Sequence, residues 1–253
     1  MKKINFLFTS IAVIAIFSFA SCTVEPLDPV LSGQVEAGNG NGSGNGNTGG
    51  GTGGTYSGDY WPTAINNTWS YERDATISTL KIGSTETING QLYYKFLPQS
   101  GSGSTTSGTV TTSLNKNSGV YKLKTDDINI NAGGLTGTQT GYEFIVLKDN
   151  IATGETWNGT YSQTTTYTGI PAIIVNTNYT GTILEKNVNA TVNGETYTNV
   201  IKVKIVQAAT FPGAPATTIN TEYWFAKNVG IIKSVSTSNG TSYTSNLVDY
   251  TLF

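Results

Sequence analysis

The sequence predicts an all-β domain made of antiparallel strands. From Tyr56 to Phe253 the chain is rich in Thr, Tyr, Val and Ile, the residues that suit a pleated, half-buried surface. Apolar and polar residues alternate with period two, most clearly over Val200–Val206, where Lys202 and Lys204 interrupt Val and Ile. Apolar residues do not recur at helical spacing over a dozen positions.

Asn-Gly pairs indicate how the strands are connected. Asn89-Gly90, Asn193-Gly194 and Asn239-Gly240 each lie between strand-like runs, and Asn-Gly suits the type I′ turn of a hairpin. Parallel strands would need crossover segments, which are absent, so we expect antiparallel meanders. Residues 101–108, 115–119, 133–134 and 211–215 are predicted to be further turns and loops.

Residues 1–21 have the organisation of an export signal. Lys2 and Lys3 precede an apolar run from Ile4 to Phe19, which is shorter than the roughly 20 apolar residues of a membrane-spanning helix. Cys22, the only cysteine, follows directly, so no internal disulfide can form. Two other interpretations of residues 1–21 are an ordinary signal peptide followed by a chance cysteine and a retained amino-terminal anchor.

The segment Phe19-Ala20-Ser21-Cys22 resembles the lipobox of bacterial lipoproteins, with Phe19 where Leu is usual. This resemblance implies that residues 1–21 are removed and that Cys22 carries a diacylglycerol thioether and an amino-terminal acyl chain such as palmitate. Two or three acyl chains hold a protein firmly in a membrane, whereas a single chain binds reversibly.

Residues 22–55 are predicted to be a disordered linker. About half of the residues from Gly33 to Gly54 are glycine, and such a segment cannot bury enough apolar surface to order itself. Its reach as a flexible coil is roughly 25 Å. Acidic residues near Cys22 (Glu25, Asp28 and Glu36) resemble the signals that send bacteroidete lipoproteins to the outer face of the outer membrane, although chance acidity is an alternative. We expect an outer-membrane lipoprotein that is surface-exposed or otherwise faces the periplasm.

Charge and residue content exclude several functions. The net charge is −2 and Arg73 is the only arginine, so the basic surface of a nucleic-acid-binding protein is missing. Histidine is absent, which removes Ser-His and Cys-His nucleophile pairs and the commonest transition-metal ligand. Ser113 and Lys116 match a Ser-x-x-Lys pattern, but in a predicted loop rather than on the helix that this pattern needs.

Carboxylates are the remaining route to catalysis. Asp126 and Asp127 are adjacent, so on a strand they would point to opposite faces. Asp127 also begins a run that is similar to a calcium loop, but Thr138 stands where such a loop has glutamate, and a strand edge is the alternative. Four glutamates could meet in the fold: Glu143, Glu155, Glu195 and Glu222. We expect no metal and no cofactor.

The domain from residue 56 to residue 253 resembles one that is common in uncharacterised bacteroidete envelope lipoproteins. The stretches that carry this resemblance are Tyr60–Pro62, Asn67–Tyr71, Gly154–Trp157 and Glu222–Lys233. It implies a strongly curved antiparallel sheet, a half-barrel or open barrel-like meander, and no established activity. Asn228 departs from the pattern, where glycine is more typical.

Aromatic residues are the candidate ligand surface. In a strand, Tyr223 and Trp224 face opposite sides of the sheet. Trp224, together with Trp61 or Tyr223, could line a concave surface that stacks on a sugar or holds an apolar chain; burial in the core is the alternative.

These observations predict a lipid-anchored envelope lipoprotein whose β domain is a non-catalytic binding module presenting aromatic side chains. Its partners would be membrane lipid, through acylated Cys22, and a glycan, a lipid or a surface protein, but not nucleic acid. The alternative function is a carboxylate-based envelope hydrolase that acts on glycans.

Overall fold

A computed structural model describes residues 58–103, 106–132 and 135–253. The predicted signal peptide, Cys22 and the glycine-rich linker lie outside the described residues. Strands and their connections make up the described part of the chain, and no helix there has the length and apolarity needed to cross a membrane.

The all-β prediction is confirmed. The first eight strands are β1 (Thr68–Arg73), β2 (Thr76–Ile88), β3 (Gln91–Phe96), β4 (Gln99–Gly103), β5 (Thr106–Val110), β6 (Thr112–Asn117), β7 (Val120–Thr125) and β8 (Ile128–Ala132). The remaining strands are β9 (Leu135–Gln139), β10 (Tyr142–Lys148), β11 (Thr156–Tyr167), β12 (Ile170–Val192), β13 (Glu195–Thr210), β14 (Thr217–Ala226), β15 (Gly230–Ser238) and β16 (Thr241–Thr251).

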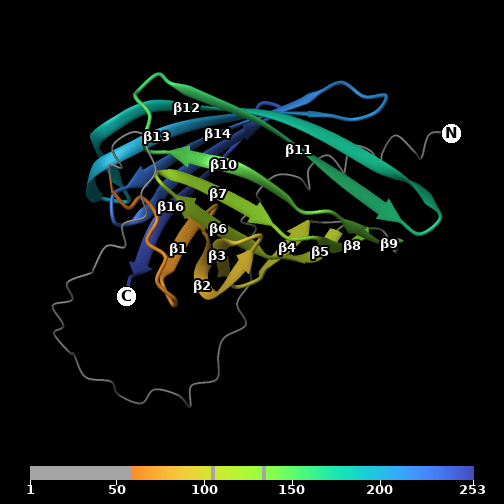
Figure 1. Ribbon diagram of the computed structural model, residues 1–253, viewed down its shortest axis with the longest axis horizontal. Helices are drawn as coiled ribbons and strands as arrows, with labels where there is room; N and C mark the ends of the chain where they lie inside the picture. The colour runs from red at the N-terminus through yellow and green to blue at the C-terminus, as the bar shows by residue number, and fades with distance from the viewer. Residues whose placement is uncertain (1–57, 104–105, 133–134) are drawn as a thin grey trace, which may run out of the picture.

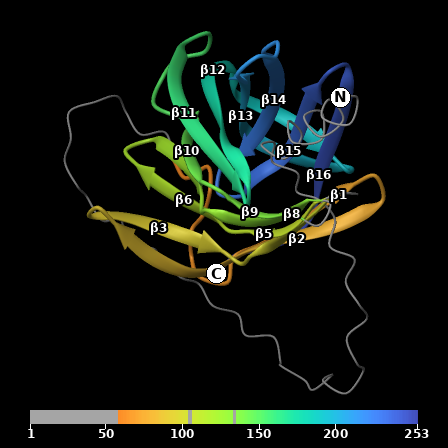
Figure 2. The same cartoon turned by 90° about the vertical axis from the view of Figure 1, so that its right-hand side faces the viewer.

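The strands form one continuous antiparallel sheet that is curved but not closed. Its order is β10-β7-β6-β3-β2-β1-β16-β15-β14-β13-β12-β11-β9-β8-β5-β4, so β10 and β4 are the two edges. The sheet curls so that β11 to β14 lie above β2 and β3 (Figure 2). Strands β11 to β16 follow one another as a meander, whereas β3 pairs with β6 and β1 pairs with β16 across long stretches of sequence.

All three predicted Asn-Gly hairpins are present. Asn89, Asn193 and Asn239 have φ angles near +50°, and the glycine after each also has a positive φ. This is the geometry of the type I′ turn, whose twist matches that of the flanking strands. The turn at Asn228, where the related pattern has glycine, is also made with a positive φ of 59°.

Two segments predicted as loops are strands. Residues 99–103 and 106–110 pair as the hairpin β4–β5, and Ser113 and Lys116 both lie on β6. The glycine content of the first segment suggested a loop, but ladder hydrogen bonds use only the backbone, and the threonines there suit a strand. The predicted turn at residues 115–119 is reduced to Ser118 and Gly119, which have positive φ angles.

The hydrophobic core fills the inside of the curl at the end where the described chain begins. Trp61 and Trp69 are almost completely buried there, and both rings contact the Phe96 ring. Phe225 of β14 packs against Trp61 with ring centroids 6.0 Å apart. Because these rings come from β1, β3, β14 and the segment before β1, the core packs the two facing parts of the curled sheet against each other.

The edge strand β10 lies next to β11 and β12 of the opposite part of the sheet (Figure 1), and aromatic side chains hold it there. The Trp157 indole on β11 donates a hydrogen bond to the Ile145 carbonyl at 3.0 Å, and the Ile145 amide donates to the Tyr179 hydroxyl on β12 at 3.1 Å. The rings of Tyr142 and Tyr161 stack with centroids 4.5 Å apart. Side chains thus connect β10 to β11 and β12, with which it forms no backbone ladder. They also cover the edge of β10, which could otherwise pair with another chain.

Glycines make room for these aromatic rings. Gly181 is the cross-strand partner of Trp157, and Gly159 is the partner of Tyr179. A Cβ atom at Gly181 would overlap the Trp157 indole, and one at Gly159 would overlap the Tyr179 ring. Each ring therefore lies flat over a glycine of the neighbouring strand, which is a recognised way to stabilise glycine within a sheet.

Candidate functional site

The three aromatic residues of the predicted ligand surface do not lie together. Trp61 is 1% exposed and is part of the core. Tyr223 is 5% exposed and faces the inside of the curl, where its ring contacts Phe225. Trp224 is half-buried on the opposite face of β14, as the alternation along the strand requires.

Trp224 lies between two lysines on the outer face. Lys202 of β13 and Lys233 of β15 are its cross-strand partners, and their ammonium groups are 4.5 and 4.7 Å from the ring centroid. The indole N–H donates to Glu222 at 2.5 Å. Cation–π contacts of this kind stabilise the sheet, and a ligand stacking on the ring would have to displace an ammonium group.

The adjacent residues Asp126 and Asp127 each make polar contacts at a bend of the chain. Asp126 forms ion pairs with Lys124 and Lys95. Although burial favours its protonated form, these lysines hold the pKa of Asp126 below its ordinary value. Asp127 accepts a hydrogen bond from the Gly141 amide at 2.7 Å, which joins the corner before β8 to the corner after β9.

The run that is similar to a calcium loop forms strand β8 over Ile128–Ala132, which lies between β5 and β9 and not at an edge of the sheet. No group of three or more potential metal-ligating Cys, Asp or Glu side chains gathers among the described residues.

The four glutamates of the hydrolase hypothesis have separate partners. Glu143 accepts a hydrogen bond from Tyr93 at 2.5 Å and pairs with Lys122. Glu155 accepts a hydrogen bond from the Ala152 amide, and Glu222 accepts one from Trp224. Glu195 is exposed at the start of β13. None of these contacts joins one glutamate to another.

Asp149, which sequence reasoning did not single out, is a buried carboxylate at the core end of the fold. It is 0% exposed, and its Oδ2 atom accepts a hydrogen bond from Tyr121 at 3.1 Å. Burial raises its pKa to about 6, although Tyr121 and Lys186 act in the opposite direction. Tyr121 in turn accepts a hydrogen bond from the Tyr60 amide at 3.0 Å, so the buried Asp149 is linked to the start of the described chain.

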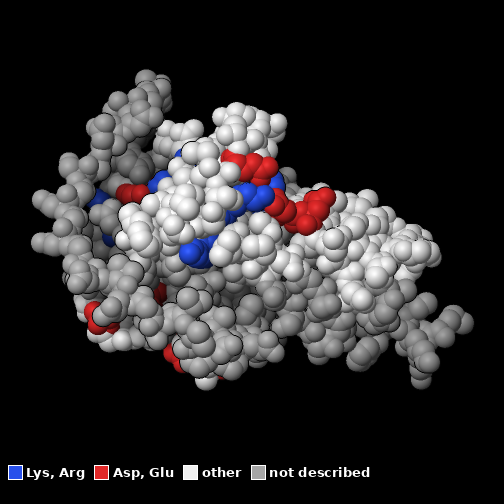
Figure 3. All heavy atoms as spheres, turned by 90° about the horizontal axis from the view of Figure 1, so that it is seen from below, with Lys and Arg blue, Asp and Glu red and all other residues white. Residues whose placement is uncertain are grey.

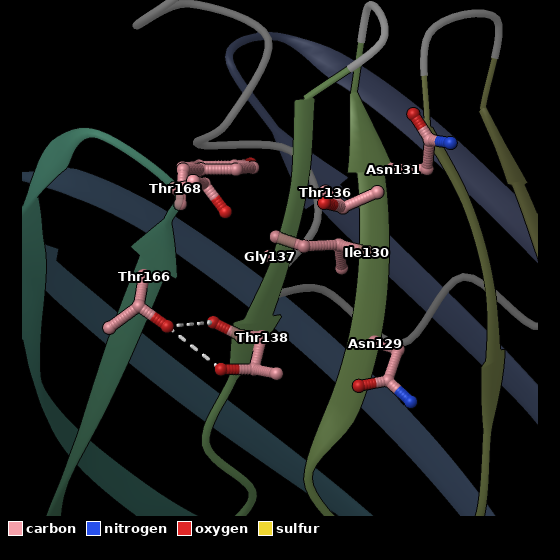
Figure 4. Close-up of a pocket in the computed structure, with 9 residues that line it drawn as sticks. Asn129, Ile130, Asn131, Thr136, Gly137, Thr138, Thr166 and Thr168 are labelled. Carbon is pink, nitrogen blue, oxygen red and sulfur yellow. Dashed lines mark hydrogen bonds between the residues drawn. The ribbon is translucent and has the colours of Figure 1, made fainter.

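A surface hollow of about 690 Å³ lies over β8, β9 and β11 (Figure 4). Six exposed, uncharged side chains line it, and Ile130, Gly137 and Tyr167 alternate with them along the same strands. The six are Asn129, Asn131, Thr136, Thr138, Thr166 and Thr168. Their register is fixed by the ladder, in which Asn129 pairs with Thr138 and Thr138 with Thr166.

The polar groups that line this hollow are hydroxyls and amides. The Thr138 and Thr166 hydroxyls hydrogen bond to each other at 2.8 Å, and both amide side chains are exposed. Such groups donate and accept hydrogen bonds without carrying charge, so they match a neutral ligand rich in hydroxyls or amides. The polar alternation of Asn129 and Asn131 was visible in the sequence, but only the pairing of β9 with β11 brings the threonines beside them.

Among the described residues on the face shown in Figure 3, charged side chains form no large field of one sign. On the face shown in Figure 3, most lysine and arginine side chains lie beside acidic ones. The ion pairs agree with this view, since Lys95 contacts both Glu86 and Asp126, and Lys202 contacts Glu185.

Comparisons with known proteins show the fold. No family model and no curated protein sequence matches the chain. A solved candidate lipoprotein from Parabacteroides distasonis is similar, with a TM-score of 0.50 and 10% identity over 76% of this chain and 98% of that one. A candidate exported protein from Bacteroides fragilis with a YmcC-like fold has a TM-score of 0.41 and 9% identity over the same shares. The first likeness shows that the chain shares the overall fold of that protein.

Proposed function

We propose that this chain is a lipid-anchored cell-envelope protein, held by acylated Cys22 in the outer membrane, whose β domain binds neutral glycans without catalysis. The lipobox-like segment supports the anchor. The structural neighbour from Parabacteroides distasonis is itself described as a candidate lipoprotein, which agrees with this assignment.

The hollow over β8, β9 and β11 is the observation that carries the binding function. Its lining of Asn and Thr side chains, with Ile130, Gly137 and Tyr167 between them, carries no charged group, and its volume is about 690 Å³. A glycan presents hydroxyl groups that both donate and accept, so it can pair with these side chains without leaving a charge unpaired.

The position of the hollow suits a tethered module. In Figure 1 the described chain begins and ends toward the left, whereas the ends of β9 and β11 lie toward the right. The predicted linker precedes Gly58, so the hollow lies at the end of the domain remote from the point where the linker would join. A ligand outside the membrane could reach it there.

Binding can be measured by titration calorimetry on the full chain carrying Cys22→Ser, with neutral oligosaccharides of glucan, mannan and N-acetylglucosamine type. We expect the double variant Thr138→Val/Thr166→Val to weaken binding about 10-fold, because it removes two hydroxyls at one place in the hollow.

The matched control is Thr237→Val, which breaks a similar exposed hydroxyl pair with Ser242 on β15 and β16. Trp224→Ala tests the aromatic surface independently. If all three variants bind as tightly as the parent chain, or if no neutral oligosaccharide binds, the proposed site is wrong. Loss of binding in Trp224→Ala alone would move the site to the outer face of β14.

A further inference from the structure

An uncharged polar strip runs along the outer face of β11 and β12 and starts at the hollow. The pleat turns every second residue of β11 outward, and the outward residue Thr166 lines the hollow itself (Figure 4). At about 3.3 Å per residue, the outward positions extend roughly 26 Å from Thr166 back to Asn158. The strip consists of Thr166, Thr164, Ser162, Thr160 and Asn158 on β11 and of Asn176, Asn178 and Thr180 on β12, all of them exposed or half-buried.

Charged side chains are absent from the strip and begin at its border. No Asp, Glu, Lys or Arg occurs in the sequence between Glu155 and Glu185. Along the outer face of β13, counted from Thr210, the first charged side chain is Lys204, which is the cross-strand partner of Thr182. A charged ligand would find no opposite charge on the strip, whereas a neutral one needs none.

The amide side chains of the strip are held in place by the neighbouring strand. The Thr180 hydroxyl donates a hydrogen bond to Oδ1 of Asn158 at 2.7 Å, and the Ser162 hydroxyl donates to Oδ1 of Asn176 at 2.6 Å. Both amide nitrogens make no hydrogen bond within the described part of the chain, so each offers its two donors to the solvent side. Side chains that are fixed before binding lose less conformational entropy when a ligand arrives.

One large apolar side chain lies beside the hollow end of the strip. Ile174 is the cross-strand partner of Thr164, shares its outward face and is 47% exposed. A pyranose has hydroxyl groups along its edge and C–H groups on its face. The strip therefore offers hydrogen-bonding groups for the edges of successive sugar residues and an apolar contact for the face of one of them.

We propose that the ligand is an internal stretch of a long neutral polysaccharide, which occupies the hollow and continues along the strip on β11 and β12. This inference rests on the proposed glycan-binding function and names its ligand as a chain rather than a single sugar or a chain end. The hollow alone would accommodate a short oligosaccharide equally well, so the dependence of affinity on chain length distinguishes the two.

The test compares disaccharides with hexasaccharides of the glucan, mannan and N-acetylglucosamine series by calorimetry on the full chain carrying Cys22→Ser. For the series that binds, we expect the hexasaccharide to bind about 10-fold more tightly than the disaccharide, because one or two additional hydrogen bonds contribute a free energy of that order.

The double variant Asn158→Val/Asn176→Val removes both amides and keeps residues that suit a strand. We expect the affinity for the hexasaccharide to fall about 10-fold, to that of the disaccharide, and the affinity for the disaccharide to stay unchanged because the hollow is intact. The matched control is Asn246→Val, which removes an outward amide on β16, four strands from β12. If the double variant does not fold, Thr160→Val replaces it with the same direction of change.

The outcomes separate this inference from the proposed function. A gain in affinity with chain length that the double variant abolishes and Asn246→Val preserves supports the strip. Equal affinities for the disaccharide and the hexasaccharide refute the strip and leave binding in the hollow alone. A gain with chain length that survives in the double variant refutes the strip as well, since the added sugar residues then contact another surface. Absence of binding by every oligosaccharide overturns the proposed function and this inference together.

Discussion

At the scale of single residues, Asp149 shows how burial turns a side chain into a pH-dependent element of stability. Its carboxyl group is surrounded by Tyr121, Lys186, Asp59 and Lys227, and burial is the largest influence on it. The pKa of Asp149 is raised to about 6 in the folded protein. The folded state therefore holds this proton more tightly than the unfolded state, whose aspartates have pKa values near 3.9.

The sign of the pH dependence follows directly. The contribution of Asp149 to stability is fully present below about pH 4 and is lost as the pH rises through about 6. Asp149→Asn removes this titration. We expect the stability of the variant relative to the parent to rise by on the order of 2 kcal/mol between pH 4 and pH 7.

Urea unfolding at a series of pH values measures this difference. The control is Asp74→Asn, which makes the same substitution at an exposed aspartate in the β1–β2 turn. Parallel pH profiles of stability for the parent chain and Asp149→Asn would show that this carboxyl group is not the source of the pH dependence.

At the scale of elements, the edge strand β10 has a backbone ladder with β7 on one side, and side chains hold its other side. Its Ile145 amide and carbonyl are both bonded to aromatic side chains on the opposite wall. Both aromatic residues depend on a glycine opposite, so four positions on β11 and β12 act together. The glycines at 159 and 181, which resemble strand breakers in the sequence, are thus part of what closes the curl.

Tyr179→Phe tests this closure. The substitution keeps the ring over Gly159 but leaves the Ile145 amide without its acceptor, so we expect a loss of roughly 1–2 kcal/mol in the free energy of unfolding. Faster hydrogen exchange at the Ile145 amide is the more specific measurement. Tyr243→Phe is the control, because Tyr243 is 48% exposed and its contact with Arg73 uses the ring rather than the hydroxyl. An unchanged exchange rate at Ile145 would show that another group protects this edge.

At the scale of the whole molecule, the sequence predicts strands well and their order poorly. Alternation over Val200–Val206 fixes which side chains face inward, and Asn-Gly pairs locate three hairpins, because both signals are local. The pairings of β3 with β6 and β9 with β11 join residues that no local pattern connects. The hollow depends on the pairing of β9 with β11, so the sequence could not predict it. Trp61 looked like a surface candidate because its partners in the core, Phe96 and Phe225, are distant in sequence.

The anchor is a prediction about the whole molecule as well. Cys22→Ser removes the only thiol that could carry lipid, so the protein should move from the membrane fraction to the soluble fraction after cell disruption. Ser21→Ala is the control, since alanine at that position keeps a small residue before the cysteine. Retention of Cys22→Ser in the membrane fraction would show that something other than acylation holds the protein.

The pairing of the first strand with the last has one more consequence. β1 and β16 lie side by side, and the Phe253 amide donates a hydrogen bond to the Asn67 side chain at 2.9 Å, so the last residue lies beside the start of β1. A peptide linker from residue 253 to residue 58, with the backbone opened at Asn193-Gly194, would give a circular permutant with the same architecture. Folding of such a permutant would mean that the arrangement of strands, and not the point at which synthesis begins, specifies this molecule.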